Sequence, residues 1–274
     1  MKEITYDEYI EVLFGILKYV DDICKKNDIQ YTLYGGSLLG AIRHSNIIPW
    51  DDDIDIALTP DNYKKLKEIM IKTNSRYKYL DGYINKSYYY PFAKIVDNQT
   101  VAYEEGKREI KDYGVYIDVF EIDNTSNNEK NRKEHYRRMA ALKRIFGVYA
   151  KTDESVKNEK SKFKKVRNYF LFKIGCKFFV KRYNNLCRKY NNKNVDYMVY
   201  NWPTYGCNRE IFKKEYYKNY TRKKFGKIDA MISEDYDSIL KTIFGDYMKL
   251  PPEEERVPKH HIKAYWREDT NEKK

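Results

Sequence analysis

Cysteine is scarce in this chain, and long apolar runs are absent. The 274 residues include four cysteines without a Cys-x-x-Cys pair, so we expect reduced thiols and neither a disulfide framework nor a zinc knuckle. No run of about 18 apolar residues that could span a membrane is present, and the acidic, amphipathic start differs from a signal peptide. These absences predict a cytoplasmic protein that is long enough for one large domain or two small ones.

Acidic residues are outnumbered by basic ones. Lys and Arg number 53 against 41 Asp and Glu, which gives a net charge of +12 and an isoelectric point of about 9.2. The excess indicates anionic partners, among which nucleic acid, a phospholipid surface and phosphorylated small molecules or glycans all qualify. An AT-rich genome would favour the same Lys, Asn and Tyr content, so the charge by itself excludes little.

The most informative stretch is 34–58, which reads YGGSLLGAIRHSNIIPWDDDIDIAL. From residue 51 onward Asp and Ile alternate, and alternate side chains of a strand share a face. One face would carry Asp51, Asp53 and Asp55, and the other Asp52, Ile54 and Ile56. Carboxylates ~4 Å apart repel by roughly 4 kcal/mol per pair at an effective dielectric of about 20, and a hard divalent cation offsets that repulsion. A surface turn without a ligand is the alternative, but the isoleucines favour a buried strand, so we predict a site for Mg²⁺ or Mn²⁺.

A glycine turn precedes these aspartates. Gly35, Gly36 and Ser37 are followed by a short apolar helix, expected over 38–42. Glycine N–H groups and the N-terminus of a helix together suit a phosphate group. The alternative is that Ser37 is a plain helix N-cap.

A further acid lies inside a strongly apolar stretch. The sequence of 113–122, YGVYIDVFEI, predicts a strand with Asp118 near its middle. An acid in such a run is unusual unless it is paired or bound to metal, so Asp118 is a candidate metal ligand or general base on the strand next to the aspartates. A solvent-facing acid on a strand edge is the alternative. Glu121 and Asp123 are expected at the surface.

The rest of the chain predicts further helices and strands and a long basic region. The expected elements are a helix over 6–26, a strand over 29–34, a helix over 61–72, β structure over 77–103, a helix over 234–244 stopped by Gly245, and disorder over 267–274. From 127 to about 193 the pattern is helical, and 157–189 holds twelve Lys or Arg and one acid, Glu159. This region is either a solvated basic face or a surface for anionic lipid or an anionic acceptor.

The polar C-terminal tail contains three more basic candidates. Arg256, His260 and His261 lie close together in sequence. They are either simply exposed or in contact with a phosphate or the acceptor.

These motifs resemble the LicD family, which is related to the fukutin-type ribitol-phosphate transferases. The resemblance is carried by 34–58, by the strand GVYIDVFEID at 114–123 and by the tail EDYDSILKTIFGDYMKLPPEEERVPKHH at 234–261. It implies an α/β (α+β) fold, a nucleotidyltransferase-like mixed β-sheet core with flanking helices and a basic helical insertion. We expect a catalytic core over 1–126, the basic helical region over 127–215 and a completing segment over 216–274. No zinc-binding insertion of the fukutin-type kind is visible, so no structural metal is expected.

The resemblance implies a metal-dependent phosphotransferase. A CDP-activated alcohol, with CDP-choline as the type donor, would bind through its diphosphate on Mg²⁺. A hydroxyl of a cell-surface glycan (teichoic acid, lipopolysaccharide or capsule, free or lipid-linked) would attack and release CMP. No nucleic-acid partner is expected, and peripheral contact with the inner face of an anionic membrane is left open.

The same resemblance assigns roles to individual residues. The metal ligands would be Asp51, Asp53, Asp55 and Asp118, the last three also catalytic, and Gly36 and Ser37 match the phosphate-binding turn. Arg43 and Lys94 are candidates for phosphate contact, because phosphoryl transfer asks mainly for positioning and charge neutralisation. A choline group would sit among aromatic rings; Tyr88, Tyr89, Tyr90 and Phe92 are the most concentrated supply, although a hydrophobic sheet explains them equally well.

Two other classes of function remain open. A nucleotidyltransferase would leave the nucleotide on a small-molecule or protein acceptor and release diphosphate, and a Gly-Ser turn with an Asp-x-Asp strand also fits that class. A non-catalytic basic protein that binds RNA or membrane would bind with a steep salt dependence. That second class gives the clustered aspartates no role.

Overall fold

A mixed β-sheet forms the centre of the fold. The structure is a computed structural model that describes residues 1–257 and 262–268. In this part of the chain the strands follow the order β2-β3-β7-β5-β4, and β8 and β9 extend the sheet from the second half of β7. Their bounds are β2 Thr32–Leu33, β3 Asp55–Leu58, β4 Tyr77–Leu80, β5 Ala93–Asp97, β7 Tyr116–Thr125, β8 Tyr197–Tyr200 and β9 Ile211–Lys213. The pair β3–β7 is parallel and the other pairs are antiparallel, which confirms the predicted α/β class.

Strand β7 begins and ends three residues later than predicted and runs through the middle of the sheet. Its first half pairs with β3 and β5, and its second half pairs with β8. The prediction that Glu121 and Asp123 are surface residues is wrong, because pairing with β8 carries this half of the strand into the core, where they are 3% and 0% exposed. The Arg188 guanidinium donates to Glu121 at 2.6 Å, and the Asn191 amide donates to Asp123 at 2.6 Å.

Four helices pack around the sheet close to their predicted positions. They are α1 Tyr6–Lys26, α2 Gly35–Arg43, α3 Pro60–Lys72 and α8 Tyr236–Phe244. A capping box between Thr5 and Glu8 starts α1. Gly245 ends α8 with φ of 70°, a conformation that glycine adopts without a steric penalty. The predicted helices over 6–26, 61–72 and 234–244 are thereby confirmed to within two residues.

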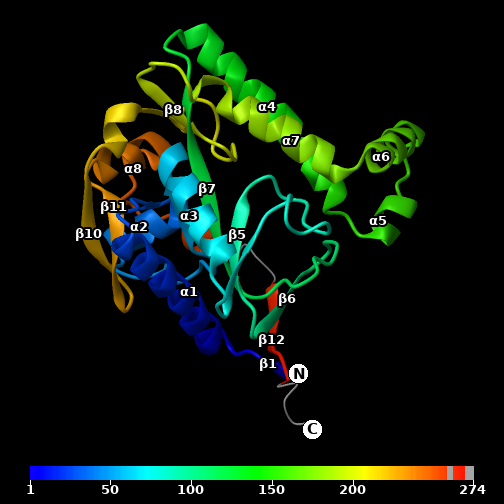
Figure 1. Cartoon of the computed structure of the whole chain (residues 1–274), viewed down its shortest axis with the longest axis horizontal. Coiled ribbons are helices and arrows are strands. Elements are labelled where there is room, and N and C mark those ends of the chain that lie inside the picture. Colours follow the sequence, from blue (N-terminus) through cyan, green and yellow to red (C-terminus); the bar gives the residue numbers. More distant parts are fainter. Residues whose placement is uncertain (258–261, 269–274) are drawn as a thin grey trace.

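Two smaller sheets complete the β structure. One joins β1 Lys2–Glu3, β12 Ile262–Trp266 and β6 Thr100–Glu104, so the first and last strands of the described chain lie side by side (Figure 1). The other is the hairpin of β10 Tyr220–Phe225 and β11 Ile228–Ser233. The predicted β structure over 77–103 is confirmed for β4, β5 and β6, while 87–92 between them is irregular.

The basic region forms a helical arm along one side of the sheet. It contains α4 Glu129–Tyr149, α5 Asp153–Lys157, α6 Lys162–Ile174 and α7 Cys176–Cys187, and the short 3₁₀ turns η1 Arg188–Tyr190, η2 Lys214–Tyr217 and η3 Glu253–Glu255 follow later in the chain. Figure 1 shows α5 and α6 at the end of the molecule away from α2 and α8. The helical pattern predicted from 127 to about 193 is confirmed. The region 127–215 is not helical throughout, because β8 and β9 belong to the central sheet; the boundaries of the three predicted regions stay a prediction.

None of the helices within the described ranges combines the length and apolar character that crossing a bilayer requires.

Candidate active site

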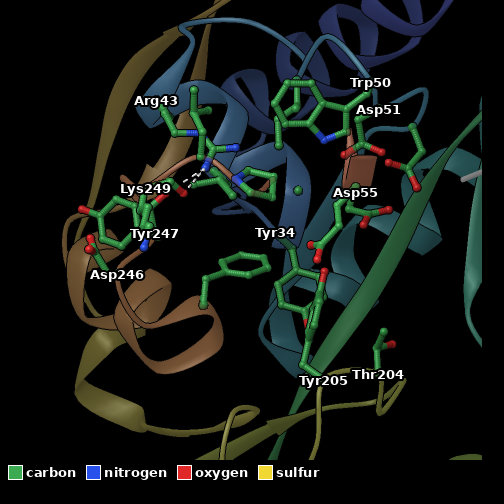
Figure 2. Close-up of a pocket in the computed structure, with 18 of the residues that line it drawn as sticks. Tyr34, Arg43, Trp50, Asp51, Asp55, Thr204, Tyr205, Asp246, Tyr247 and Lys249 are labelled. Atoms are coloured by element: carbon green, nitrogen blue, oxygen red, sulfur yellow. Dashed lines mark hydrogen bonds between the residues drawn. The ribbon is translucent and has the colours of Figure 1, made fainter. Parts of the chain in front are cut away.

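A cavity of about 700 Å³ lies beside β3 and β7. Four carboxylates line one part of it: Asp51, Asp53, Asp55 and Asp118, here called the acidic wall. The rest of the lining comes from α2, from 202–205 and from the chain between 244 and 255. Figure 2 shows Asp51 and Asp55 on one side of the cavity and Arg43, Asp246 and Lys249 across from them. The structure therefore brings the predicted carboxylates together in one place.

The register of two parallel strands sets the centre of the acidic wall. Asp55 on β3 lies opposite Asp118 on β7, and the Asp118 N–H donates to the Ile54 carbonyl at 2.9 Å. The predicted position of Asp118, on the strand next to the aspartates, is confirmed. The predicted strand over 51–58 is too long, since β3 begins only at Asp55. A turn in which the Asp51 N–H donates to the Ile48 carbonyl at 2.8 Å precedes it, so the first two acids reach the cavity from irregular chain.

Burial and mutual repulsion raise the pKa values of two acids of the acidic wall, Asp55 and Asp118. Burial, and then the charges of Asp53 and Asp118, raise the pKa of Asp55 well above its ordinary range. The pKa of Asp118 is also raised, to about 6, because burial outweighs the attraction of Lys94. Such shifts gather where a site is built to hold a cation or to move a proton.

Lys94 lies behind Asp118 and does not line the cavity, whereas contact with a donor phosphate would require its ammonium to reach the cavity. Its ammonium lies 2.5 Å from the Asp118 carboxylate and 3.5 Å from the ring centre of Tyr116, and the residue is 2% exposed. It is not among the residues that line the cavity. Lys94 therefore balances the charge of Asp118 from behind, and direct contact with a donor phosphate stays a prediction.

The acidic wall offers the ligands that Mg²⁺ or Mn²⁺ prefers without forming a closed cage. Within 1–257 and 262–268, no three His, Cys, Asp or Glu side chains are grouped so that they could hold an ion. Magnesium is commonly held by one or two carboxylates together with substrate phosphates and water rather than by protein ligands alone. Partly buried carboxylates, with raised pKa values at Asp55 and Asp118, beside an open cavity fit that mode of binding.

The glycine turn holds α2 directly against the acidic wall. A methyl group at Gly36 would lie 2.4 Å from the Asp51 carboxylate, so only glycine allows this approach. The Ser37 hydroxyl accepts the Asp55 N–H at 2.8 Å and is buried. The alternative that Ser37 caps the helix is wrong, because α2 begins at Gly35 with Tyr34 as its N-cap. Of the three turn residues, Gly36 is the one that lines the cavity.

Across the cavity from the acidic wall, Arg43 holds the chain at 247–249. Its guanidinium lines the cavity and donates to the carbonyls of Tyr247 at 3.0 Å and Lys249 at 3.3 Å. Arg256 lies nearby, with its guanidinium 5.7 Å from the Trp50 ring centre, but it is not among the lining residues. The other tail candidates, His260 and His261, lie outside the described residues.

One wall of the cavity, the segment 202–205, was not predicted from the sequence. Trp202, Thr204 and Tyr205 line the cavity, and the backbone of the last two is held by Glu210, which is 0% exposed. The carboxylate of Glu210 accepts hydrogen bonds from the Tyr34 hydroxyl (2.9 Å), the Tyr136 hydroxyl (2.5 Å) and the backbone N–H groups of Thr204 (2.8 Å), Tyr205 (2.9 Å) and Gly206 (3.2 Å). A lone Glu in a turn-rich piece carries no pattern that would have identified it, because two of its partners, Tyr34 and Tyr136, come from distant parts of the chain.

Aromatic rings cover much of the cavity, although not the ones expected from sequence. The lining rings are those of Tyr34, Trp50, Phe120, Trp202, Tyr205, Phe244 and Tyr247. None of Tyr88, Tyr89, Tyr90 and Phe92 is among the lining residues. Phe92 instead packs behind the wall, with ring centres 4.7 Å from Phe120 and 5.0 Å from Trp202.

Comparison with known proteins places the chain in a family. A family model described as the LicD/FKTN/FKRP nucleotidyltransferase domain matches residues 28–147. The chain is 30% identical over 271 residues to the lipopolysaccharide cholinephosphotransferase LicD of Haemophilus influenzae, an alignment that covers 97% of this chain and 99% of that protein. A segment of 41 residues is 49% identical to the ribitol 5-phosphate transferase FKRP of Homo sapiens, covering 15% of this chain and 8% of that relative. The chain therefore belongs to the LicD family of phosphotransferase enzymes.

Proposed function

We propose that this chain transfers phosphocholine from CDP-choline to a hydroxyl of a cell-surface glycan. The near full-length similarity to a lipopolysaccharide cholinephosphotransferase supports the choice of group and acceptor class. The observation that carries the proposal is the acidic wall, in which Asp55 and Asp118 lie side by side on parallel strands at a cavity of about 700 Å³. A cavity of this size accommodates a nucleotide-sized ligand.

Different acids of the cavity would have different roles in the reaction. One or two of the carboxylates of Asp51, Asp53 and Asp55 would hold Mg²⁺ or Mn²⁺ together with the donor diphosphate, and the ion when bound supplies neutralisation of phosphate charge. Asp118 is the candidate to accept the proton of the attacking hydroxyl. The acceptor oxygen forms a bond to the β-phosphorus, the bond between that phosphorus and the bridging oxygen breaks, and CMP leaves with the bridging oxygen.

The aromatic side of the cavity suits the choline group. A quaternary ammonium binds over ring faces with roughly 0.5 to 2 kcal/mol per good contact. Trp202, Tyr205 and Phe120 line the cavity together with Asp55 and Asp118. These rings, rather than the run 88–92, are the proposed contacts of the choline group.

A screen of donors tests the assignment of the substrate. Thermal unfolding is followed with CDP-choline, CDP-ribitol, CDP-glycerol and CDP-ethanolamine, each with Mg²⁺ and again with EDTA. The proposal predicts the largest rise of the midpoint for CDP-choline and loss of that rise with EDTA, since binding to the folded state stabilises it. A larger rise for CDP-ribitol would assign the chain to the ribitol-phosphate transferases, and equal rises in EDTA would contradict the metal site.

A nucleotidyltransferase reaction is the second candidate. The family model is described as a nucleotidyltransferase domain, and acids beside a glycine turn serve that chemistry too. It differs in its products, because the nucleotide would remain on the acceptor and diphosphate would be released.

A further inference from the structure

Helix α6 carries a row of large apolar side chains on its exposed side. Phe163, Val166, Phe170 and Ile174, here called the apolar stripe, are 79%, 57%, 55% and 52% exposed. Their spacing of three, four and four residues places them on one face of the helix. Exposed apolar residues are ordinary when they are scattered, but a continuous row marks an interaction site.

The opposite side of α6 attaches the helix to the body of the protein. Asn168 is 1% exposed, and the Phe172 ring packs edge-on against Tyr149 with ring centres 5.2 Å apart. The Arg108 guanidinium lies 5.0 Å from the Phe172 ring centre. The apolar stripe therefore takes no part in holding the helix in place, and its exposure is not required by the fold.

Basic side chains border the apolar stripe on both sides. At 3.6 residues per turn, Lys162 and Lys173 fall along one edge of the stripe and Arg167 along the other. Helix α6 has no acidic residue, and the segment 157–189 holds twelve bases and one acid. A solvated basic face, the alternative considered from the sequence, would not present phenylalanine side chains to water.

We infer that α6 docks on an anionic phospholipid surface, with the apolar stripe among the acyl chains and the bordering bases at the headgroups. A helix with this arrangement lies in the plane of a bilayer interface and prefers anionic lipid. Charge complementarity selects this partner over a second copy of the chain, whose own arm would bring the same positive charge. The inference goes beyond the proposed reaction and does not depend on it, because docking needs neither donor nor metal.

Vesicle sedimentation with the full chain tests the inference. Vesicles of phosphatidylcholine alone are compared with vesicles that also contain phosphatidylglycerol, without nucleotide or metal. Wild type is expected to bind the anionic vesicles and to bind the neutral ones weakly. The double variant Phe163→Ser/Phe170→Ser should bind the anionic vesicles at least about tenfold more weakly, because each phenylalanine loses its burial in lipid. Lys162→Gln/Lys173→Gln should weaken binding to the anionic vesicles alone.

Matched substitutions elsewhere serve as controls. Ile71→Ser/Ile84→Ser removes two side chains that are 50% and 49% exposed on other elements, and Lys64→Gln/Lys65→Gln removes two exposed charges from α3. Both should bind vesicles like wild type, and circular dichroism should show that every variant is folded. The inference is overturned if wild type ignores anionic vesicles or if the stripe variant binds as tightly as wild type. It is also overturned if the stripe drives self-association in sedimentation velocity without vesicle binding.

Discussion

Asp55 has opposite effects on stability and on the proposed reaction: its charge repels neighbouring acids in the fold but would be needed to bind the metal ion. It lies opposite Asp118 in the register and has Asp51 and Asp53 as further acidic neighbours, and its pKa is raised. Replacing it by Asn keeps the shape and removes one repelling charge. If Asp55 served stability instead, its replacement would lower the free energy of unfolding and leave turnover unchanged.

Asp55→Asn is expected to lower kcat by at least about 100-fold, because charge neutralisation of the transferred group is lost. The free energy of unfolding in EDTA should stay level or rise, since repulsion within the acidic wall is relieved. Denaturant unfolding and CMP release measure the two effects. Asp229→Asn, at an exposed position of β11, is the control and should change neither; a large loss of stability in Asp55→Asn would contradict this account of the acidic wall.

The stability of the metal-free protein should depend on pH in a direction set by the same acids. A folded-state pKa above the unfolded value means that the folded state binds more protons in between, so stability from that group is present at low pH and lost as pH rises. For Asp118 the window runs from about pH 4 to about pH 6, and for Asp55 it begins at about pH 4 and continues upward. The difference in unfolding free energy between Asp55→Asn and wild type should therefore grow with pH in EDTA. A difference that stays constant from about pH 4 to about pH 8 would show that Asp55 is not shifted.

Gly36 offers a test of how closely α2 must approach the acidic wall. In Gly36→Ala the new methyl group would meet the Asp51 carboxylate at 2.4 Å, so the carboxylate must move. We expect at least about a tenfold loss of kcat, because small displacements in a catalytic site are costly. Gly147→Ala is the matched control: no atom lies within 4 Å of its added methyl group, and in the last turn of α4 it should leave the stability level or raise it slightly. Equal activity of the two variants would mean that the position of Asp51 is unimportant.

Among the elements, the segment 202–206 depends on one buried carboxylate. The Glu210 carboxylate is the acceptor in each of its hydrogen bonds, including those from Tyr34 at the start of α2 and Tyr136 on α4. Glu210 therefore connects the segment 204–206 to both the start of α2 and the helical arm. It acts as a positioning residue.

Glu210→Gln turns one acceptor atom into a donor that faces other donors. The unmet bonds should cost about 1–3 kcal/mol of stability, and the loosened wall should raise KM for the donor more than it lowers kcat. Steady-state kinetics over a range of donor concentrations separates the two parameters. Glu215→Gln, an exposed acid a few residues further along, should leave both unchanged. A fall of kcat with constant KM would instead assign Glu210 to the chemical step.

Local sequence pattern correctly predicted elements that depend on residues close together in the chain. It failed for residues whose structure depends on partners far away in the chain. The helix over 6–26 follows from its apolar spacing and its cap, and its bounds are those of α1. The strand over 51–58 was too long because alternation alone cannot show that only residues from Asp55 onward find a partner strand. Glu121 and Asp123 were misplaced for the related reason that β8, more than 70 residues later, buries them.

At the scale of the whole molecule, the cavity and the far end of the basic arm lie in different parts of the fold. Strands β3 and β7 and the irregular chain before β3 carry the acidic wall, α2, 202–205 and the chain between 244 and 255 line the rest of the cavity, and α6 lies at the far end of the arm (Figure 1). The class of fold and the acids were predictable because they are encoded in continuous motifs. The contribution of 202–205 to the cavity was not predictable, since this segment approaches 34–58 only in the folded structure.

The identity of the nucleotide product tests the central claim most directly. The chain is incubated with Mg²⁺, a cell-surface glycan acceptor and either CDP-choline labelled in its choline or labelled CTP, and the products are separated. The account predicts CMP and labelled acceptor from CDP-choline, and loss of both in EDTA with recovery on adding Mg²⁺ or Mn²⁺. Pyrophosphate from CTP with the nucleotide left on the acceptor, or full transfer after exhaustive chelation, would contradict it.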